Sequence, residues 1–336
     1  MDEPERILVI RLKSIGDVVL TLPAVNLIRD NFPRARITFL TSQENARLPE
    51  GFGPVDEVIG VDRAVYRRWN PAAIVGHSIR LLRQIRHNRF SITVDFQGYG
   101  ETALLTWLSG APRRWGNVYR GMRRWAYTRR VPRDRNVHPA EWNRSLLVKC
   151  GLQATSVRNH FDLPEHDLES ARAAFAARGC DPDRPTLYVQ PFTSSAHKDW
   201  PLEKYLAVAR FWQARGVQIL FGGGPADAPS LEPARTAGFV VVAGVPLMTA
   251  AGLMKLSSVV IGGDTGFLHL AVALGKRVVM LLNSGGPGSA SPFGHADWAV
   301  APPGGLPLAR IETEAILQAT ASALSQGDLC RNAVGK

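Results

Sequence analysis

The sequence predicts an α/β protein made of two doubly wound, Rossmann-like domains, and three observations support this fold class. Short apolar runs, typical of strands buried in parallel sheets, alternate with segments of helical periodicity. The alternation stops at a polar, proline-containing stretch over residues 162–167 and then restarts. A chain of 336 residues is also longer than one hydrophobic core usually covers. We therefore expect an N-terminal domain over residues 1–163 and a C-terminal domain over residues 164–336.

The N-terminal domain is expected to start with a strand. Residues 6–11 form a nearly continuous apolar run, as in a strand that is buried on both faces. A glycine turn at Gly16 follows, and apolar residues at helical spacing predict one helix over residues 18–29. Further strands are expected at residues 37–40, 57–60 and 92–96, with a helix over residues 73–88.

The C-terminal domain repeats this alternation. Strands are expected at residues 187–190, 217–221, 240–242, 259–261 and 278–282, and helices at residues 202–215 and 266–274. A last helix, at about residues 312–324, is a candidate to cross back to the first domain. Because open α/β sheets bind ligands beyond the carboxyl ends of their strands, two such domains in tandem predict a cleft between them that holds the substrates.

Composition excludes several classes of protein. An apolar fraction of 45% with 21% charged residues is ordinary for a folded soluble chain. The cysteines Cys150, Cys180 and Cys330 are far apart and form no C-x-x-C pair, so we expect them to be reduced and structural. No H-E-x-x-H pattern supports a catalytic metal. The acidic start lacks the features of a secretory signal and no apolar run has the length of a membrane helix, so we expect a cytoplasmic location.

The positive charge is concentrated in the first half of the chain. The net charge is +11, and residues 1–160 carry 26 Lys and Arg against 14 Asp and Glu. Residues 63–144 alone hold 17 arginines. Such a surface attracts polyanions, which include nucleic acid, an anionic membrane and a phosphorylated acceptor. Composition alone does not choose among them.

A turn in the second half is a candidate phosphate site. Asp264, Thr265 and Gly266 follow an expected strand and open an expected helix. Free backbone N–H groups and the positive end of the helix dipole can hold a phosphate there. The alternative is a plain helix cap, and His269 taken alone would be a packed helix histidine.

Three other loops could carry chemistry. A glycine-rich turn before Asp227 could lie against a nucleotide ribose, and Lys198, in the loop after the strand at residues 187–190, could neutralise a leaving diphosphate. Asp17 follows the first strand and is the best candidate for a general base. The structural alternatives are helix caps for both aspartates and a solvated loop lysine.

Four blocks of sequence, in order over residues 6–282, together resemble glycosyltransferase family 9, the heptosyltransferases. The first runs from Ile7 to Ala24 and includes Gly16-Asp17-Val18. The others are Asp95-Phe96-Gln97-Gly98 with Ala103-Leu104-Leu105, then Lys198-x-Trp200-Pro201, then Asp264-Thr265-Gly266-x-x-His269-x-Ala271-x-Ala273-Leu274-Gly275. The resemblance implies the GT-B fold, with an acceptor-binding N-terminal domain and a donor-binding C-terminal domain that face a central cleft.

The resemblance also implies a reaction and roles for single residues. The reaction is an inverting, metal-independent transfer of heptose from ADP-heptose to a sugar of the lipopolysaccharide core, so the donor is a substrate and no cofactor is expected. Asp17 corresponds to the general base and Lys198 to the lysine that binds the diphosphate. The donor-binding positions that match the family are Thr193, Ser194, Lys198, Met248, Asp264, Thr265, Gly266 and His269. On the acceptor side we assign Gly16 and Gln97.

Two positions depart from the family pattern. Ala226 stands where many relatives carry an acidic residue for the nucleotide ribose, and we expect Asp227 to replace it. Glu101 stands where relatives often have a basic residue near the acceptor. The charge reversal suggests an unusual acceptor, or other basic groups that serve it. The candidates are Arg67, Arg68, Arg113 and Arg114, for each of which a solvated surface charge is the alternative.

Two other functions remain open at this point. One is a GT-B glycosyltransferase with another nucleotide sugar or a non-lipopolysaccharide acceptor. The other is nucleic-acid binding by aromatic residues among arginines, namely Trp115, Tyr119, Trp125 and Tyr127 with Arg114, Arg120, Arg123 and Arg124. The second leaves the C-terminal motifs without a purpose. We therefore expect a monomer on the inner face of the inner membrane, where it meets a nucleotide-sugar donor and a lipid-linked oligosaccharide but no nucleic acid.

Overall fold

The chain divides into two compact units. The computed structural model describes residues 4–67, 70–118 and 121–334. Unit 1 ends at His160 and unit 2 begins at Phe161. This division falls close to the boundary expected from the sequence, at the start of the polar stretch that contains Pro164. Each unit is described by itself below.

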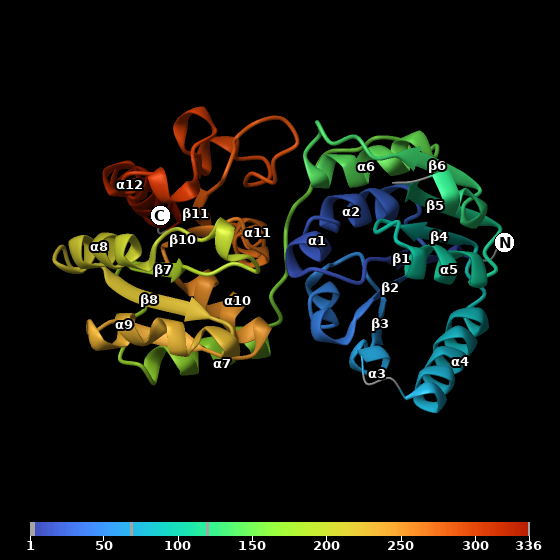
Figure 1. The fold of residues 1–336 in the computed structure, drawn as a ribbon, viewed down its shortest axis with the longest axis horizontal. Coiled ribbons are helices and arrows are strands. Elements are labelled where there is room, and N and C mark those ends of the chain that lie inside the picture. Colours follow the sequence, from blue (N-terminus) through green and yellow to red (C-terminus); the bar gives the residue numbers. More distant parts are fainter. Residues whose placement is uncertain (1–3, 68–69, 119–120, 335–336) are drawn as a thin grey trace. The chain divides into compact units, whose positions relative to one another are not determined.

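Unit 1 contains a parallel, six-stranded sheet with helices on both faces (Figure 1). Its strands are β1 (Arg6–Ile10), β2 (Arg36–Ser42), β3 (Glu57–Val61), β4 (Ile92–Asp95), β5 (Arg113–Val118) and β6 (Arg129–Pro132). Its helices are α1 (Ile15–Val19), α2 (Leu22–Asn31), α3 (Ala64–Arg67), α4 (Pro71–His87), α5 (Gly100–Leu108) and α6 (Pro139–Lys149). The strand order is β3-β2-β1-β4-β5-β6.

Unit 2 contains a second parallel, six-stranded sheet of order β12-β11-β10-β7-β8-β9. Its strands are β7 (Thr186–Gln190), β8 (Gln218–Gly223), β9 (Val240–Ala243), β10 (Val259–Gly263), β11 (Arg277–Leu281) and β12 (Ala299–Val300). Its helices are α7 (Glu165–Ala176), α8 (Leu202–Gln213), α9 (Glu232–Thr236), α10 (Leu247–Leu256), α11 (Gly266–Ala273) and α12 (Thr313–Val334). The α/β class with two doubly wound sheets is therefore confirmed.

Each sheet has one point at which the chain reverses its direction of travel. In unit 1 the chain moves outward from β1 through β2 to β3 and then returns to pair β4 with β1. In unit 2 it moves from β7 through β8 to β9 and then pairs β10 with β7. Open parallel sheets bind ligands beyond the carboxyl ends of the strands at such a switch point. The loops after β1, β4, β7 and β10 are thus the places to look for a site.

The structure corrects several expected elements. The single helix over residues 18–29 is two helices, because α1 ends at Val19 and α2 starts at Leu22 with Pro23 in its first turn. Pro23 has no N–H to continue a helix, and the Thr21 hydroxyl donates to the Val18 carbonyl at 2.6 Å between the two. Strands β5 and β6 were not predicted, because both begin with two arginines instead of an apolar run.

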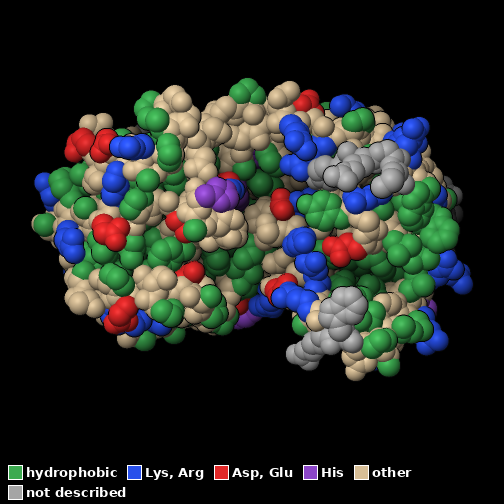
Figure 2. All heavy atoms as spheres, viewed as in Figure 1, with side chains coloured by type: hydrophobic (Ala, Val, Ile, Leu, Met, Phe, Trp, Pro, Cys, Tyr) green, Lys and Arg blue, Asp and Glu red, His purple; other side chains and the backbone are tan. Residues whose placement is uncertain are grey.

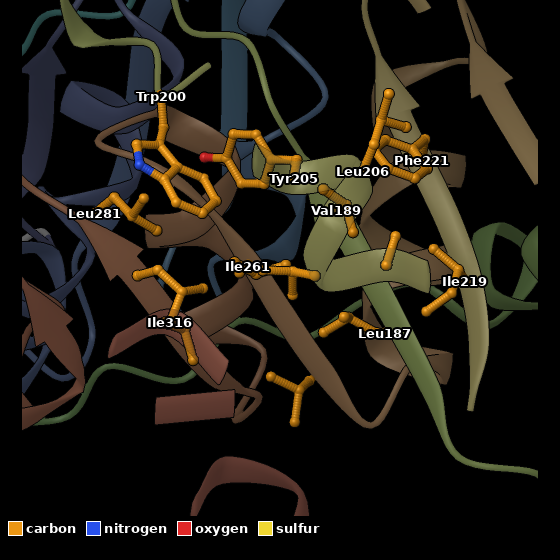
Figure 3. Packing of buried hydrophobic residues seen from close by; sticks show 14 of the residues in the cluster. Leu187, Val189, Trp200, Tyr205, Leu206, Ile219, Phe221, Ile261, Leu281 and Ile316 are labelled. Carbon is orange, nitrogen blue, oxygen red and sulfur yellow. The ribbon is translucent and has the colours of Figure 1, made fainter. Parts of the chain in front are cut away.

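The core of unit 2 fixes the loop that follows β7. Trp200 and Tyr205 are buried and meet edge to face with ring centroids 4.9 Å apart (Figure 3). Both pack in one apolar cluster with Val189 and Ile261. The Trp200 indole N–H also donates to the Ile311 carbonyl at 3.1 Å. A buried tryptophan with its polar atom paired anchors this loop to the sheet.

The C-terminal helix belongs to unit 2. Helix α12 packs against β10, β11 and α8, and Ile316 and Ala323 are buried in the cluster that contains Trp200. Within the described residues, this helix therefore has neighbours in its own unit, and its expected crossing to unit 1 stays a prediction. Within the same residues, no helix has both the length and the apolar character needed to span a membrane.

Candidate functional site

Asp17 lies in α1, directly after the carboxyl end of β1. One carboxylate oxygen lies 2.6 Å from an Arg11 guanidinium nitrogen, and the other accepts the Ser14 backbone N–H at 3.2 Å. The side chain of Asp17 is 43% exposed, whereas Arg11 is buried at 8% and also donates to the Phe96 carbonyl at 2.6 Å. Asp17 therefore caps its helix and still presents a carboxylate to solvent.

Arg11 lowers the pKa of this carboxylate. Burial acts to raise the pKa of Asp17, but the nearby Arg11 charge and the hydrogen bonds from Arg11 and Ser14 lower it below its ordinary value of 3.8. Asp17 is thus ionised and ready to accept a proton at neutral pH. Arg11 was not predicted as a site residue. The signal for it was present, since an arginine at the end of an otherwise apolar buried strand needs a partner.

The loop after β4 lies next to this site, because β4 pairs with β1. Gln97 is buried at 1%, and its side-chain oxygen accepts the backbone N–H groups of Leu12 and Lys13 at 2.8 and 3.3 Å. Its Nε2 is buried and has no hydrogen-bond partner among the described residues. Gln97 therefore ties together the two loops of the switch point.

Asp95, at the end of β4, holds the same loop through hydrogen bonds. It is fully buried and accepts the backbone N–H groups of Gln97 and Gly98 at 2.8 and 2.9 Å, together with the Tyr127 hydroxyl at 2.7 Å. Burial raises the pKa of Asp95, and these hydrogen bonds oppose the rise. Gly98 has a φ of 68°, a conformation that favours glycine. The Asp-x-Gln-Gly segment is thus a turn whose conformation is fixed by hydrogen bonds to Asp95.

The predicted acceptor-side residues do not all lie together. Gly16 is buried in α1 beside Asp17. Arg67 ends α3, with an ion pair of 3.4 Å to Glu44. Arg68 lies outside the described residues. Arg113 and Arg114 begin β5, and Arg113 is in register with Ile92 at the start of β4, so both lie at the amino end of the sheet.

The structure gives Arg113 and Arg114 structural partners there. Arg113 pairs with Glu5, and Arg114 donates to the carbonyls of Ala126 and Ala111 at 2.9 and 2.7 Å. Asp17 follows the opposite end of the strands. The sequence could not show this, because it does not reveal at which end of an unpredicted strand an arginine lies.

The aromatic residues of the nucleic-acid hypothesis are divided between core and surface. Trp115 and Tyr127 are buried at 5% and 6%, so neither offers a ring face for stacking on a base. Trp125 is 53% exposed. Tyr119 and Arg120 fall outside the described part of the chain. Two of the four rings that motivated this hypothesis therefore serve the core of unit 1.

In unit 2, Lys198, Asp264 and His269 form one cluster. The Lys198 ammonium lies 2.7 Å from one Asp264 carboxylate oxygen, and the His269 Nε2 lies 3.3 Å from the other. Asp264 follows β10, and Lys198 lies in the loop after β7, which is the neighbouring strand. Lys198 is 37% exposed, Asp264 is 24% exposed and His269 is buried at 4%. The cation is thus the outermost member of the cluster.

The cluster keeps Asp264 ionised. Burial alone would raise the pKa of Asp264, but the hydrogen bond and charge of His269, together with Lys198, lower it to about 2. The other ring nitrogen of His269, Nδ1, is buried without a hydrogen-bond partner among the described residues. Asp264 therefore holds Lys198 in place by charge as well as by geometry.

The turn after β10 opens α11 as predicted. The Thr265 side chain accepts the backbone N–H of Phe267 at 3.3 Å and caps the helix, and Gly266 is its first residue. Thr265 thus has the structural role that was its alternative assignment. The Leu268 N–H also donates to the Thr265 carbonyl at 3.0 Å, so among the described contacts the Gly266 N–H is the group of this first turn that is left for an anion.

Close approach of two loops explains a glycine in this turn. A Cβ on Gly263 would lie 2.8 Å from a Thr193 methyl group and 2.9 Å from the Lys198 carbonyl oxygen. The Thr193 N–H donates to Asp199 at 2.7 Å and its hydroxyl donates to the Ser195 carbonyl at 2.9 Å. Ser194 is exposed. Thr193 therefore shapes the loop that carries Lys198.

Two predicted donor residues lie farther along unit 2. Asp227 accepts the Gly224 backbone N–H at 2.8 Å, so it caps the turn after β8. This is the structural alternative that its position suggested. Met248 is buried at 2% in the first turn of α10. Strand β8 neighbours β7, so the Asp227 turn lies at the same edge of the sheet as Lys198.

Each switch point therefore has one reactive group that is paired with a less exposed group of opposite charge. A half-exposed, ionised carboxylate can accept a proton, and an ammonium at the positive end of a helix dipole can bind a phosphate. No cluster of three or more potential metal ligands occurs within the described residues. Cys150 and Cys180 are buried free thiols, and the side chain of Cys330 is outside the description.

Comparisons with known proteins agree with one another. The sequence profile described as glycosyltransferase family 9 (heptosyltransferase) matches residues 78–303. Lipopolysaccharide heptosyltransferase 1 of Salmonella typhimurium is 24% identical over 307 residues, which cover 89% of this chain and 94% of that protein. A glycosyl transferase family 9 structure from Veillonella parvula has a TM-score of 0.85, 22% identity and coverage of 96% and 97%. An E. coli heptosyltransferase solved with ADP-2-deoxy-2-fluoro heptose has a TM-score of 0.77, 20% identity and coverage of 94% and 99%.

Proposed function

This chain belongs to glycosyltransferase family 9 (heptosyltransferase), and we propose that it transfers a heptose from ADP-heptose to a sugar of the lipopolysaccharide core. The name of the Salmonella relative supports the acceptor, and the E. coli complex with a fluorinated ADP-heptose supports the donor. The residues at the two switch points supply the chemistry such a transfer needs.

The observation that carries the proposal is the Lys198–Asp264–His269 cluster at the start of α11. Departure of ADP from the sugar leaves negative charge on the diphosphate. Lys198 and the positive end of the α11 dipole, with the Gly266 N–H, would stabilise that charge as it develops, so that the transfer would need no metal ion. Asp264 keeps Lys198 in position before the donor binds.

Asp17 is the proposed general base. It would take the proton from the acceptor hydroxyl while that oxygen forms a bond to the anomeric carbon and the bond to the diphosphate breaks. A single displacement of this kind inverts the anomeric configuration. The carboxylate fits the role because it is ionised and half-exposed, and because Arg11 and Ser14 fix its orientation.

The acceptor is proposed to be lipid-linked and to be reached at an anionic membrane surface by a monomeric, peripheral protein on the cytoplasmic side. The basic excess in residues 1–160 supports this part of the proposal, since cationic surfaces are attracted to anionic lipid. Glu101 bears on which sugar position of the acceptor is modified. Its carboxylate oxygen lies 3.7 Å from a guanidinium nitrogen of Arg63, so an acidic and a basic side chain lie together at this position.

A second candidate is transfer of another sugar by the same machinery. It is favoured by Ala226, which offers no carboxylate to a ribose, and by the use of Asp227 as a cap for Gly224. A donor whose nucleotide needs no acidic ribose contact would suit this arrangement equally well.

Incubation with matched donors tests the proposal. The protein is mixed with a heptose-deficient core acceptor and with ADP-heptose, a UDP-hexose or a GDP-hexose, and transfer is followed by mass spectrometry. We expect transfer from ADP-heptose, with a product of inverted anomeric configuration by NMR coupling constants. Transfer only from a UDP- or GDP-sugar would reject heptose transfer in favour of the second candidate.

A further inference from the structure

An apolar cavity of about 470 Å³ lies in unit 1, between α4 and α5. Leu81 and Leu82 of α4 and Leu104, Leu105 and Leu108 of α5 make up much of its wall. Its volume falls in the range of small-molecule pockets, roughly 300–1,000 Å³. Neither Asp17 nor Gln97 lines it, although Arg67 and Glu101, which the sequence placed on the acceptor side, do. A leucine-lined space of this size has no role in the transfer step itself.

One side of the cavity is polar and charged. Arg63, Arg67 and Glu101 line it, and the Arg67 side chain is 72% exposed, so it stands at the solvent boundary. Arg63 is held near Glu101 at 3.7 Å. A ligand with an aliphatic tail and an anionic head matches this distribution, because the tail would meet leucines and the head would meet guanidinium groups.

The surface around the cavity is apolar as well. We define the α4–α5 face as Val75, Ile79, Leu104, Trp107 and Trp125, which are between 44% and 56% exposed. Trp107 and Trp125 pack edge to face, with ring centroids 5.7 Å apart. Figure 2 shows hydrophobic side chains gathered over the region of α4 and α5, with Lys and Arg side chains at its margins. Exposed apolar patches of this kind mark interaction sites.

Arginines of α4 and of the turn that follows it continue this face. A shallow groove shares Ile79 and Leu82 with the cavity and is lined farther on by Arg83, Arg86 and Arg89. Residues 71–87 contain no Asp or Glu, so α4 carries no acid to neutralise these charges. Aliphatic side chains, tryptophans and arginines on one face are the combination found on proteins that lie in the headgroup region of an anionic bilayer.

We propose that the α4–α5 face docks on an anionic lipid bilayer and that the cavity takes one acyl chain of a lipid from it. The arginines of α4 meet headgroup phosphates, and Trp107 and Trp125 lie at the level of the headgroups. This deepens the membrane part of the proposed function. Vesicle binding needs neither the donor nor the acceptor sugar, so a failed transfer assay does not reject the docking proposal. Likewise, a failed vesicle assay does not reject heptose transfer.

Vesicle sedimentation tests the charged part of the face. We expect the full-length protein to bind vesicles of phosphatidylcholine with phosphatidylglycerol and not vesicles of phosphatidylcholine alone. Arg83→Glu replaces a positive with a negative charge at an exposed position and should weaken binding by roughly tenfold or more. Arg210→Glu, the same change at an exposed position of α8, is the control and should leave binding unchanged.

A fluorescent fatty acid, cis-parinaric acid, tests the cavity. We expect saturable binding by the wild type and by Ser78→Ala, and loss of binding in Ser78→Phe, whose ring would fill the space beside Leu82. Leu104→Asp supplies a second variant that the fold should tolerate, because Leu104 is 45% exposed, and it should lose both fatty-acid and vesicle binding. Thermal midpoints of all variants are compared with the wild type.

Three results would overturn the proposal. One is equal binding to neutral and anionic vesicles, and another is unchanged lipid and fatty-acid binding in both Arg83→Glu and Leu104→Asp. The third is a dimer in lipid-free buffer, seen by light scattering, that Leu104→Asp dissociates, because the α4–α5 face would then belong to a second copy of the chain.

Discussion

The two units have the same strand order around their switch points but present opposite charges there. In unit 1 the exposed group is the Asp17 carboxylate and the buried group behind it is Arg11. In unit 2 the more exposed group is the Lys198 ammonium. Behind it lie Asp264, which is 24% exposed, and His269, which is buried. One topology thus carries a proton acceptor in one unit and an anion-binding group in the other.

The comparison teaches how a reactive charge is held. Neither Asp17 nor Lys198 is fixed by its own burial, since both are more than a third exposed. Each is fixed by a partner of opposite charge that is itself more deeply buried and further hydrogen-bonded or paired. Pairing a buried charge offsets much of its desolvation cost and leaves the outer group oriented for chemistry.

Removal of the outer group in unit 1 should have the largest effect. Asp17→Asn keeps the shape of the side chain but cannot accept the acceptor proton, so we expect the rate of heptose transfer to fall by about 10² to 10⁴-fold. Asp62→Asn is the matched control, since Asp62 is an exposed carboxylate that follows β3 at the same edge of the sheet. A transfer rate for Asp17→Asn within a few-fold of the control would remove Asp17 from the mechanism.

Removal of the outer group in unit 2 should come next. Lys198→Ala deletes the cation that faces the leaving diphosphate, and we expect kcat to fall by about 10² to 10³-fold. Lys255→Ala, at the end of α10, is the control. The rates are measured at saturating donor concentration, so that a weaker affinity for the donor does not lower the measured kcat. Equal kcat values for the two variants would show that the leaving group is stabilised elsewhere.

The buried partner in unit 1 should matter less than the group it holds. Arg11→Gln removes the charge that lowers the pKa of Asp17, so this pKa should rise and the acid limb of the kcat/KM profile should move to higher pH. Loss of orientation should cost roughly tenfold to a hundredfold in kcat at neutral pH. Arg11→Lys should restore part of both. A lower rate with an unmoved acid limb would reduce Arg11 to a packing residue.

Asp264, the partner of Lys198 in unit 2, should make the stability of the fold depend on pH. The pKa of Asp264 is lowered from 3.8 to about 2 in the folded state. A lowered carboxylate pKa stabilises the fold above the unfolded value, and this stability is lost as the pH falls through the folded value. The contribution is about 2 kcal/mol above pH ~4.

Asp264→Asn checks this prediction directly. The variant has no carboxylate to protonate, so between about pH 5 and pH 2 its free energy of unfolding should fall by about 2 kcal/mol less than that of the wild type. Chemical denaturation of both proteins across this range gives the comparison. Parallel curves would show that the cluster does not perturb Asp264.

The sequence was informative where local chemistry repeats a known pattern. The strands at the switch points were predicted because β1, β4, β7 and β10 are buried on both faces and read as apolar runs. The residues after them, Asp17, Gln97, Lys198 and Asp264, followed from their positions and from the resemblance. Pairing between β7 and β10 then explains why residues so distant in sequence lie together.

What the sequence could not give depends on register and packing. Arg113 and Arg114 belong to β5, which lies between β4 and β6 and has no apolar run, so the sequence did not show that they lie at the amino end of the sheet. Asp227 and Thr265 have helix-capping roles that any short polar residue at that position could fill. The cavity between α4 and α5 depends on how the two helices pack, and no sequence pattern indicated that packing.

Calorimetric titration with ADP tests the division of labour between the two units most directly. If the donor diphosphate binds at the Lys198 cluster and Asp17 acts only on the acceptor, Asp17→Asn binds ADP as tightly as the wild type, and Lys198→Ala binds it more weakly. Equal loss of ADP affinity in both variants, or full affinity in Lys198→Ala, would contradict the account.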